Sequence, residues 1–173
     1  MNITKVWQSD GEAGIKQTLR RMQELVISSD ANRVIKQKAR EIILKLSPTD
    51  ELGQIQAIFR WVQQNLMYVR DIYGVEEITS PDKIVHSVIN GLNQHSSDCD
   101  DFAILLSALL RAVGFRTRIE ALAINQADGY DHARAAVFVK TLNKWWPLEG
   151  TKSAVEAGYG LPSKMTILAM EVY

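Results

Sequence analysis

The amino-acid sequence predicts an α+β fold, in which helices come first and an antiparallel sheet follows. Two observations support this prediction. Apolar residues recur at helical spacing through much of residues 11–89, and beyond Gly114 the period changes to two, which is typical of strands. Between these parts, residues 102–113 are apolar at nearly every position. Because a helix that is apolar all round is a buried helix, we expect this segment to lie inside the molecule, against the sheet.

Four helices are expected ahead of the buried one. Ser80 is a good N-cap and Pro81 suits the first helical position, so the fourth helix begins there and ends near Asn90. Thr49 is a good N-cap for the third helix. Residues 67–80, between the third and fourth helices, mix aromatic and polar side chains and are expected to form a loop. The expected helices span 11–28, 31–46, 52–66 and 81–89.

Four strands are expected after the buried helix. Gly114 ends that helix, because glycine tolerates the left-handed conformation that closes many helices. Polar and apolar residues alternate directly afterwards, and Asn143 lies in a turn between the second and third strands. The expected strands span 116–121, 132–140, 144–148 and 165–173.

Composition and net charge limit the class of protein. Hydrophobic residues make up 46% of the chain and charged residues 23%, values that are ordinary for a globular protein with a core. The formal net charge is zero, whereas a dedicated nucleic-acid binder normally carries a basic excess. We therefore expect no nucleic-acid partner.

The charge is unevenly distributed along the chain. Residues 1–45 carry nine basic and five acidic side chains, and the remainder carries the compensating acidic excess. Two interpretations stay open: these charges form solvated helix faces, or the basic front docks on an acidic partner. The length suits one domain with a helical extension, which we place at residues 1–48, packed on a core at residues 49–173.

Cysteine usage and hydropathy bear on the location of the protein. The single cysteine, Cys99, cannot form an internal disulfide, so nothing requires an oxidising compartment. No apolar run approaches the roughly 18 residues of a membrane span, and residues 1–10 lack the pattern of a secretory signal. We therefore expect a cytoplasmic protein with no membrane partner.

Cys99 is placed where a thiol can react. It follows Asp98, a good N-cap, and so occupies the first position of the buried helix. The first N–H groups and the positive end of the helix dipole favour the thiolate, and the same N–H groups can stabilise an oxyanion. Asp100 and Asp101 oppose the thiolate, but successive helical side chains diverge by about 100°, so they need not face the sulfur. The alternative is a small buried core residue, as most free cysteines are.

A nucleophilic cysteine needs a base, and the chain contains three histidines. His86 lies on the surface of the short fourth helix, and His95 lies in a polar loop ahead of Cys99. His132 opens a strand, and a strand end holds a base in a fixed orientation better than a loop does. A hairpin can bring Glu149, 17 residues later, beside His132 to orient the imidazole. The alternative is that His132 is an ordinary histidine at a strand edge.

Metal and nucleotide chemistry are not indicated. His95 and the acidic residues around Cys99 form a dense cluster, but neither CxxC nor HExxH spacing is present. The segment SSDCDDF lacks the alternating oxygens and the glycine of a calcium loop. The chain also lacks the GxGxxG and GxxxxGK[ST] motifs. We therefore expect no metal and no cofactor.

Three segments taken together resemble the transglutaminase-like core of the papain-like cysteine enzymes. They are DCDDFAILLSALLRAVGFRTRIEAL, DHARAAVFV and KWWPLEGT, and an amphipathic segment, IQAIFRWVQQNLMYVRD, precedes them. The resemblance covers residues 49–151 and keeps the order and spacing of the three sites. It implies a papain-like or transglutaminase-like core, in which the helix of the nucleophile is buried against an antiparallel sheet after N-terminal helices.

The resemblance implies roles for individual residues. Cys99 matches the nucleophile, His132 the general base and acid, and Glu149 the acid that orients the histidine. The Cys99 backbone N–H is implied as one donor of an oxyanion hole, and Gln94 is a candidate for the other donor.

The sequence departs from the family pattern in two respects. The family usually has aspartate where this chain has Glu149, and a shift of a catalytic group by about 1 Å can cost a large factor in rate. Ser97 stands where the family usually has glycine, and Asp98 directly precedes the cysteine, which tightens the approach to the sulfur. These departures concern activity more than fold.

The resemblance implies thiol-dependent chemistry on an amide bond. Hydrolysis, as in a cysteine protease or amidase, is expected unless the site excludes water. Attack by a lysine amine would instead give a cross-link between glutamine and lysine. A related arylamine acetyltransferase would need coenzyme A, for which the sequence shows no basic phosphate cradle.

A structural function is the alternative. The stretch YVRDIYGVEEITSPDKIV resembles the versions carried by phages and prophages. A catalytically relaxed member would be a structural or assembly protein of a phage particle, incorporated in the virion. Its basic N-terminal helices would then dock on phage structural proteins.

Overall fold

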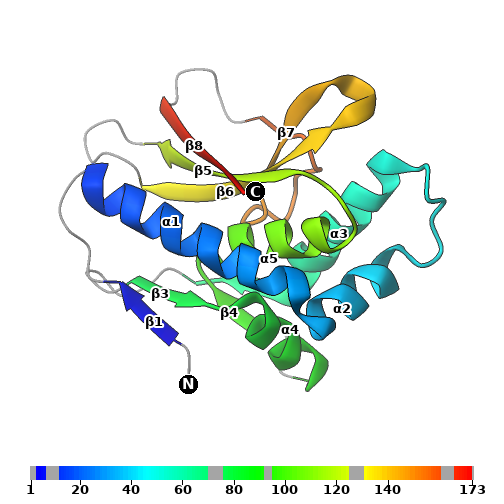
Figure 1. Ribbon diagram of the computed structural model, residues 1–173, viewed down its shortest axis with the longest axis horizontal. Helices are drawn as coiled ribbons and strands as arrows, with labels where there is room; N and C mark the ends of the chain where they lie inside the picture. Colours follow the sequence, from blue (N-terminus) through cyan, green and yellow to red (C-terminus); the bar gives the residue numbers. More distant parts are fainter. Residues whose placement is uncertain are drawn as a thin grey trace.

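The computed structural model describes residues 3–6, 12–69, 76–91, 95–124, 131–160 and 166–172, and it confirms the α+β fold. The described residues form five helices and a four-stranded main sheet. Figure 1 shows the helices gathered below that sheet. The helices are α1 (Glu12–Ser28), α2 (Arg33–Ile43), α3 (Glu51–Asn65), α4 (Pro81–Ile89) and α5 (Cys99–Ala112), with single 3₁₀ turns at Ser29–Ala31 and Lys140–Leu142. None of these described helices combines the length and apolar character needed to span a membrane.

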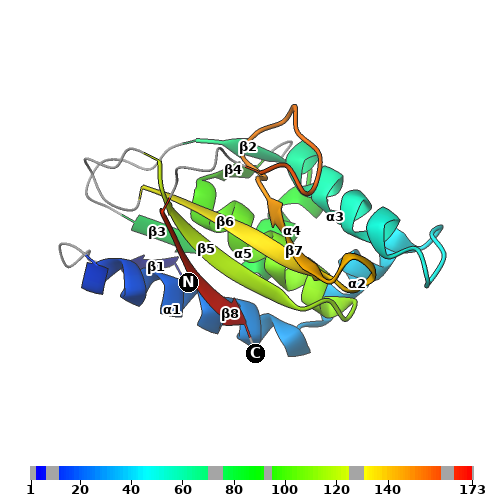
Figure 2. The same cartoon turned by 90° about the horizontal axis from the view of Figure 1, so that it is seen from above.

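The main sheet is antiparallel throughout and has the strand order β7-β6-β5-β8. Figure 2, seen from above, shows its central strands lying over α5. Two pairs of short strands lie apart from it: β1 pairs with β3 in antiparallel fashion, and β2 pairs with β4 in parallel fashion. The strands are β1 (Ile3–Val6), β2 (Leu66–Tyr68), β3 (Glu76–Thr79), β4 (His95–Ser97), β5 (Thr117–Ala123), β6 (His132–Val139), β7 (Lys144–Leu148) and β8 (Thr166–Val172).

Helix α5 is the centre of the core, as its apolar sequence predicts. Its residues 100–110 are all buried. One face packs in a cluster with α2, α3, α4 and β6, and the other packs in a second cluster with α1 and β5. Helices α1 and α2 therefore contribute to the same core as the sheet. The division of the chain at residues 48 and 49 stays a prediction.

The local expectations differ from the structure in two places. The N-cap of α3 is Asp50, not Thr49, because the Asp50 carboxylate accepts a hydrogen bond of 3.0 Å from the Gly53 N–H. The expected loop at 67–80 is bounded by strand residues of β2 and β3. Both strands have only three or four residues, too few for a periodic pattern to emerge from the sequence.

Helix α5 and strand β6 run in the same direction, which decides where the candidate residues lie. The chain turns at Gly114, whose φ of 96° is left-handed, and returns along β5, and β6 then runs antiparallel to β5. Cys99, the first residue of α5, and His132, the first residue of β6, are therefore at the same end of the molecule (Figures 1 and 2).

The residue after Glu149 fixes the end of β7 against the first turn of α5. A Cβ added to Gly150 would lie 2.9 Å from Phe102 Cδ1 and 3.1 Å from Leu106 Cδ1. The absence of a side chain at Gly150 therefore lets the end of β7 approach the helix that begins with Cys99.

Gly150→Ala is predicted to destabilise the fold by about 1–3 kcal/mol, because Phe102 must move out of a packed position. Urea unfolding of the native and variant proteins measures this difference. The matched control is Gly160→Ala, since an added Cβ there meets nothing within 4 Å. Equal stability of the two variants would show that the backbone at Gly150 does not lie close against Phe102.

Candidate active site

Asp98 fixes the start of the helix that carries the candidate nucleophile. Its carboxylate accepts hydrogen bonds from the backbone N–H groups of Asp100, at 3.1 Å, and Asp101, at 3.2 Å. Asp98 is thus the N-cap, and Cys99 is the first residue of α5, as predicted. The Cys99 side chain is partly exposed and packs against the cluster that contains Ala133. Its sulfur therefore lies at the positive end of the helix dipole, where a thiolate is favoured.

Asp100 faces the sulfur, although the divergence of successive helical side chains did not require either neighbouring aspartate to do so. The Cys99 thiol donates to Asp100 Oδ1 over 3.7 Å. Asp101 does point away, since its carboxylate accepts the Thr79 N–H at 2.8 Å. A carboxylate this close disfavours the thiolate, so a nearby cation is needed before Cys99 can ionise readily.

His132 and Glu149 form the hydrogen-bonded pair that the sequence suggested. His132 Nε2 lies 2.9 Å from Glu149 Oε1 and 3.0 Å from Oε2. Strands β6 and β7 bring them together, because Ala135 pairs with Leu148 and both side chains lie just beyond that pair, at the same end of the two strands. Thr151 Oγ1 adds a hydrogen bond of 2.6 Å to Glu149 Oε1. The longer glutamate side chain thus reaches the imidazole with both oxygens.

Glu149 is fully buried, with 0% of its surface exposed, yet its carboxylate is held in the charged form. Burial alone would raise the pKa of Glu149. The hydrogen bond and positive charge of His132 oppose this effect, helped by Thr151 and the charge of Arg134, and the pKa of Glu149 falls below its ordinary value of 4.5.

The charge of Glu149 decides which nitrogen of His132 can act as a base. An ionised carboxylate only accepts hydrogen bonds, so Nε2 must carry a proton and donate it to Glu149. In the neutral imidazole, Nδ1 is then the nitrogen with a lone pair, which can take a proton from a neighbouring group. His132 thus has a fixed tautomer and lies at the same end of the fold as Cys99, the first residue of α5.

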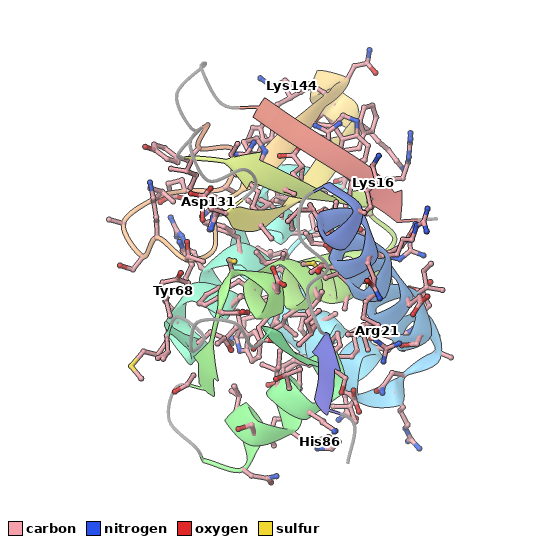
Figure 3. The ribbon with its side chains drawn as sticks, turned by 90° about the vertical axis from the view of Figure 1, so that its left-hand side faces the viewer. Lys16, Arg21, Tyr68, His86, Asp131 and Lys144 are labelled. Atoms are coloured by element: carbon pink, nitrogen blue, oxygen red, sulfur yellow. The ribbon has the colours of Figure 1, made fainter. Side chains whose placement is uncertain are left out.

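The other predicted residues lie outside this pair or outside the described chain. His86 is exposed on α4, and Figure 3 shows it well apart from Asp131, the residue before His132. His95 belongs to β4. Gln94, the candidate donor to an oxyanion, lies outside the described residues. Within the described ranges, no group of three or more histidine, cysteine or acidic side chains could hold a metal ion.

Sequence reasoning missed three polar side chains around Glu149. Thr151 bonds it directly, and Arg134 and Glu120 form a buried ion pair beside it, with Nε–Oε2 at 2.7 Å. The available signal was the polar alternation of β5 and the arginine in HARAAVFV, a charged residue among small apolar ones. Alternation shows which residues share a face of a strand, but it does not show that this face is buried.

Glu149→Gln is predicted to destabilise the protein near neutral pH by about 1–3 kcal/mol, the cost of losing charged hydrogen bonds. Because the folded-state pKa of Glu149 is lowered, its stabilising contribution is present above about pH 4.5 and is lost as the pH falls through the folded-state pKa. Urea unfolding across this range should therefore show the native protein and the variant converging in acid. Glu156→Gln, on an exposed carboxylate, is the control, and a difference that persists unchanged in acid would contradict the prediction.

Solved structures resemble the fold at low sequence identity. A protein from Parabacteroides distasonis ATCC 8503, described as "a putative protease", has a TM-score of 0.59 and 15% identity, covering 83% of this chain and 30% of its own. A "putative cysteine protease" from Cytophaga hutchinsonii has a TM-score of 0.48 and 16% identity, covering 97% of this chain and 60% of its own. This chain thus spans less than two thirds of either protein, and the first likeness concerns the fold alone.

The family assignment comes from the sequence. No curated protein matches the chain. The family model of the transglutaminase-like superfamily matches residues 36–150, a range that includes Cys99, His132 and Glu149. The match covers more than half of the chain, and the helix-and-sheet architecture agrees with it. The chain belongs to the transglutaminase-like superfamily.

Proposed function

We propose that the protein is a cysteine hydrolase that cleaves a peptide or other amide bond through Cys99, His132 and Glu149. The observation that carries the proposal is the His132–Glu149 hydrogen bond of 2.9 Å at the end of the fold where Cys99 begins α5. Glu149 keeps its negative charge although it is fully buried. Active sites commonly use such buried charges and their partners to adjust the pKa of a catalytic base.

The proposed reaction begins with the Cys99 thiolate attacking the carbonyl carbon of the amide. The Cys99 N–H, at the first position of α5, donates to the oxyanion that develops, and Gln94 is the proposed second donor. His132, protonated on both nitrogens and paired with Glu149, then gives its Nδ1 proton to the leaving amine. A water molecule then gives a proton to His132 Nδ1 and attacks the thioester, which releases the acid and restores the Cys99 thiolate.

Water is the proposed second substrate. The Cys99 side chain is partly exposed, so water reaches the region of the thioester. Transfer to a lysine amine would need a site that excludes water while admitting the amine. We therefore expect hydrolysis. A product assay with added lysine would reveal transfer to the amine if it occurred.

Cys99 is predicted to react with iodoacetamide well below the ordinary thiol pKa of about 8.5, because His132 supplies the cation that outweighs Asp100. His132→Gln should slow this alkylation at neutral pH by about tenfold or more. His86→Gln, on an exposed histidine of α4, is the matched control and should leave the rate unchanged. Mass spectrometry of the alkylated protein over a pH series gives the rates.

Turnover supplies the second arm of this test. Cys99→Ala should abolish hydrolysis of a fluorogenic peptide library while leaving the circular dichroism spectrum unchanged. An alanine variant with native activity, or a Cys99 whose alkylation is indifferent to His132, would contradict the proposal.

A second candidate function, docking on an acidic protein partner, is supported by the surface of α2. Arg33, Lys36 and Arg40 line a hollow of about 360 Å³ together with Ala31 and Gln37. None of the three cations forms an ion pair with another described residue. Unpaired cations around a hollow attract an acidic segment. This surface fits the alternative in which the protein serves an assembly, and its origin in a phage stays a prediction.

A glutamate-rich peptide should bind this surface with a Kd that rises steeply with salt, since the attraction is electrostatic. The triple variant Arg33→Glu, Lys36→Glu, Arg40→Glu should raise the Kd by at least about tenfold, which corresponds to a loss of about 1.4 kcal/mol of binding free energy. The control reverses three charges elsewhere, at Lys83, Lys144 and Lys152. Fluorescence anisotropy measures both, and equal weakening by the two triple variants would show that net charge, not the α2 surface, controls binding.

A further inference from the structure

Arg134 lies in the middle of a row of charged side chains that crosses the main sheet. On one side it pairs with Glu120 in the register of β6 and β5. On the other side, the next residue, Ala135, pairs with Leu148 of β7. In an antiparallel pair, the residue before Ala135 faces the residue after Leu148, so Arg134 faces Glu149. The row therefore places one arginine between two carboxylates.

We propose that Arg134, held by Glu120, is a positioning residue that keeps Glu149 ionised and in place against His132. The proposal rests on the proposed function, because it assigns to Arg134 a role in preparing the candidate base. It goes beyond that function, because neither Arg134 nor Glu120 belongs to the predicted catalytic residues.

The contacts of the row leave Arg134 little freedom. Its Nε donates to Glu120 Oε2 at 2.7 Å, and the other oxygen of Glu120 accepts from Arg118 Nε at 2.8 Å. Only 6% of the Arg134 surface and 1% of the Glu120 surface is exposed. A charge so enclosed is weakly screened by solvent, and its field acts strongly on the neighbouring Glu149.

Burying Arg134 costs free energy, which indicates that its positive charge has a role beside Glu149. The buried Nη1 of Arg134 has no hydrogen-bond partner among the described residues. An apolar side chain at this position would avoid that cost, and buried ion pairs are often replaced by apolar residues without loss of stability. The charge of Arg134 also contributes to the lowered pKa of Glu149, after burial, which raises it, and after His132 and Thr151.

The other charged groups nearby do not replace Arg134 in this role. Helix α5 packs against the end of β7 through Gly150 and carries only acidic groups in its first turn. Of these, Asp98 caps the helix, Asp100 accepts from the thiol and Asp101 accepts from the Thr79 N–H. Among the described residues, the positive charges that act on Glu149 come from β6 alone, from His132 and Arg134.

The test is a titration of the Glu149 carboxyl carbon by ¹³C NMR, together with the pH profile of Cys99 alkylation. Arg134→Met removes the charge but keeps an unbranched side chain. It should raise the midpoint of the Glu149 titration. Between the two midpoints it should slow Cys99 alkylation by up to about tenfold for each pH unit of that shift. At neutral pH, where Glu149 is ionised in both proteins, the rates should converge. A loss of packing alone would lower the rate at every pH.

The matched control is Arg118→Met, which removes the other arginine bound to Glu120 and leaves Arg134 in place. It should shift the Glu149 titration much less than Arg134→Met does. Arg134→Lys restores the charge without the planar guanidinium and should return the midpoint close to the native one. This variant also decides the question if Arg134→Met does not fold.

Equal shifts in the two methionine variants, or a lysine variant as altered as the methionine one, would overturn the proposal. The NMR titration reports on the charged row even if Cys99 has no enzymatic role. A raised Glu149 midpoint with an unreactive native Cys99 would therefore support the positioning of Glu149 and contradict the proposed hydrolase.

Discussion

The buried carboxylate of Glu149 is the constraint on which the rest of the site depends. Three side chains meet at it: His132 through hydrogen bonds to both oxygens, Thr151 through a third, and Arg134 through its charge. A charged group with no exposed surface is unfavourable unless such partners compensate it. The same partners fix the tautomer of His132, so the stability of the sheet edge and the chemistry of the candidate base have one physical origin.

The main fold features serve to bring that carboxylate to the start of α5. The helix is buried because its sequence is apolar all round, and the sheet covers it. Strand β6 runs in the direction of α5, which sets His132 and Cys99 at one end. Gly150 lets β7 close onto the first turn of the helix. A glutamate in place of the aspartate usual in the family is accommodated, since both of its oxygens lie within 3.0 Å of the imidazole.

Sequence reasoning predicted the helices, the main sheet and the start of α5, because each carries a strong local signal. Asp98 before an apolar run marked the N-terminus of α5, and the change of period after Gly114 marked the strands. It could not find the partners of Glu149. Arg134 and Glu120 form their ion pair across strands, and register is set by tertiary packing. Nor could it predict that Asp100 faces the thiol, which depends on side-chain rotamers at the first turn.

The proposed hydrolysis requires that His132 Nδ1, the nitrogen that Glu149 leaves open, is directed at Cys99. A high-resolution crystal structure of the native protein tests it through the distance between Cys99 Sγ and His132 Nδ1. We expect the two atoms within hydrogen-bond reach, at about 3–4 Å, a range that allows for the size of sulfur and for the looser contacts of a substrate-free site. The proposal would be contradicted if Nδ1 were bonded to another group and the sulfur were turned into the apolar cluster formed with α1 and β5.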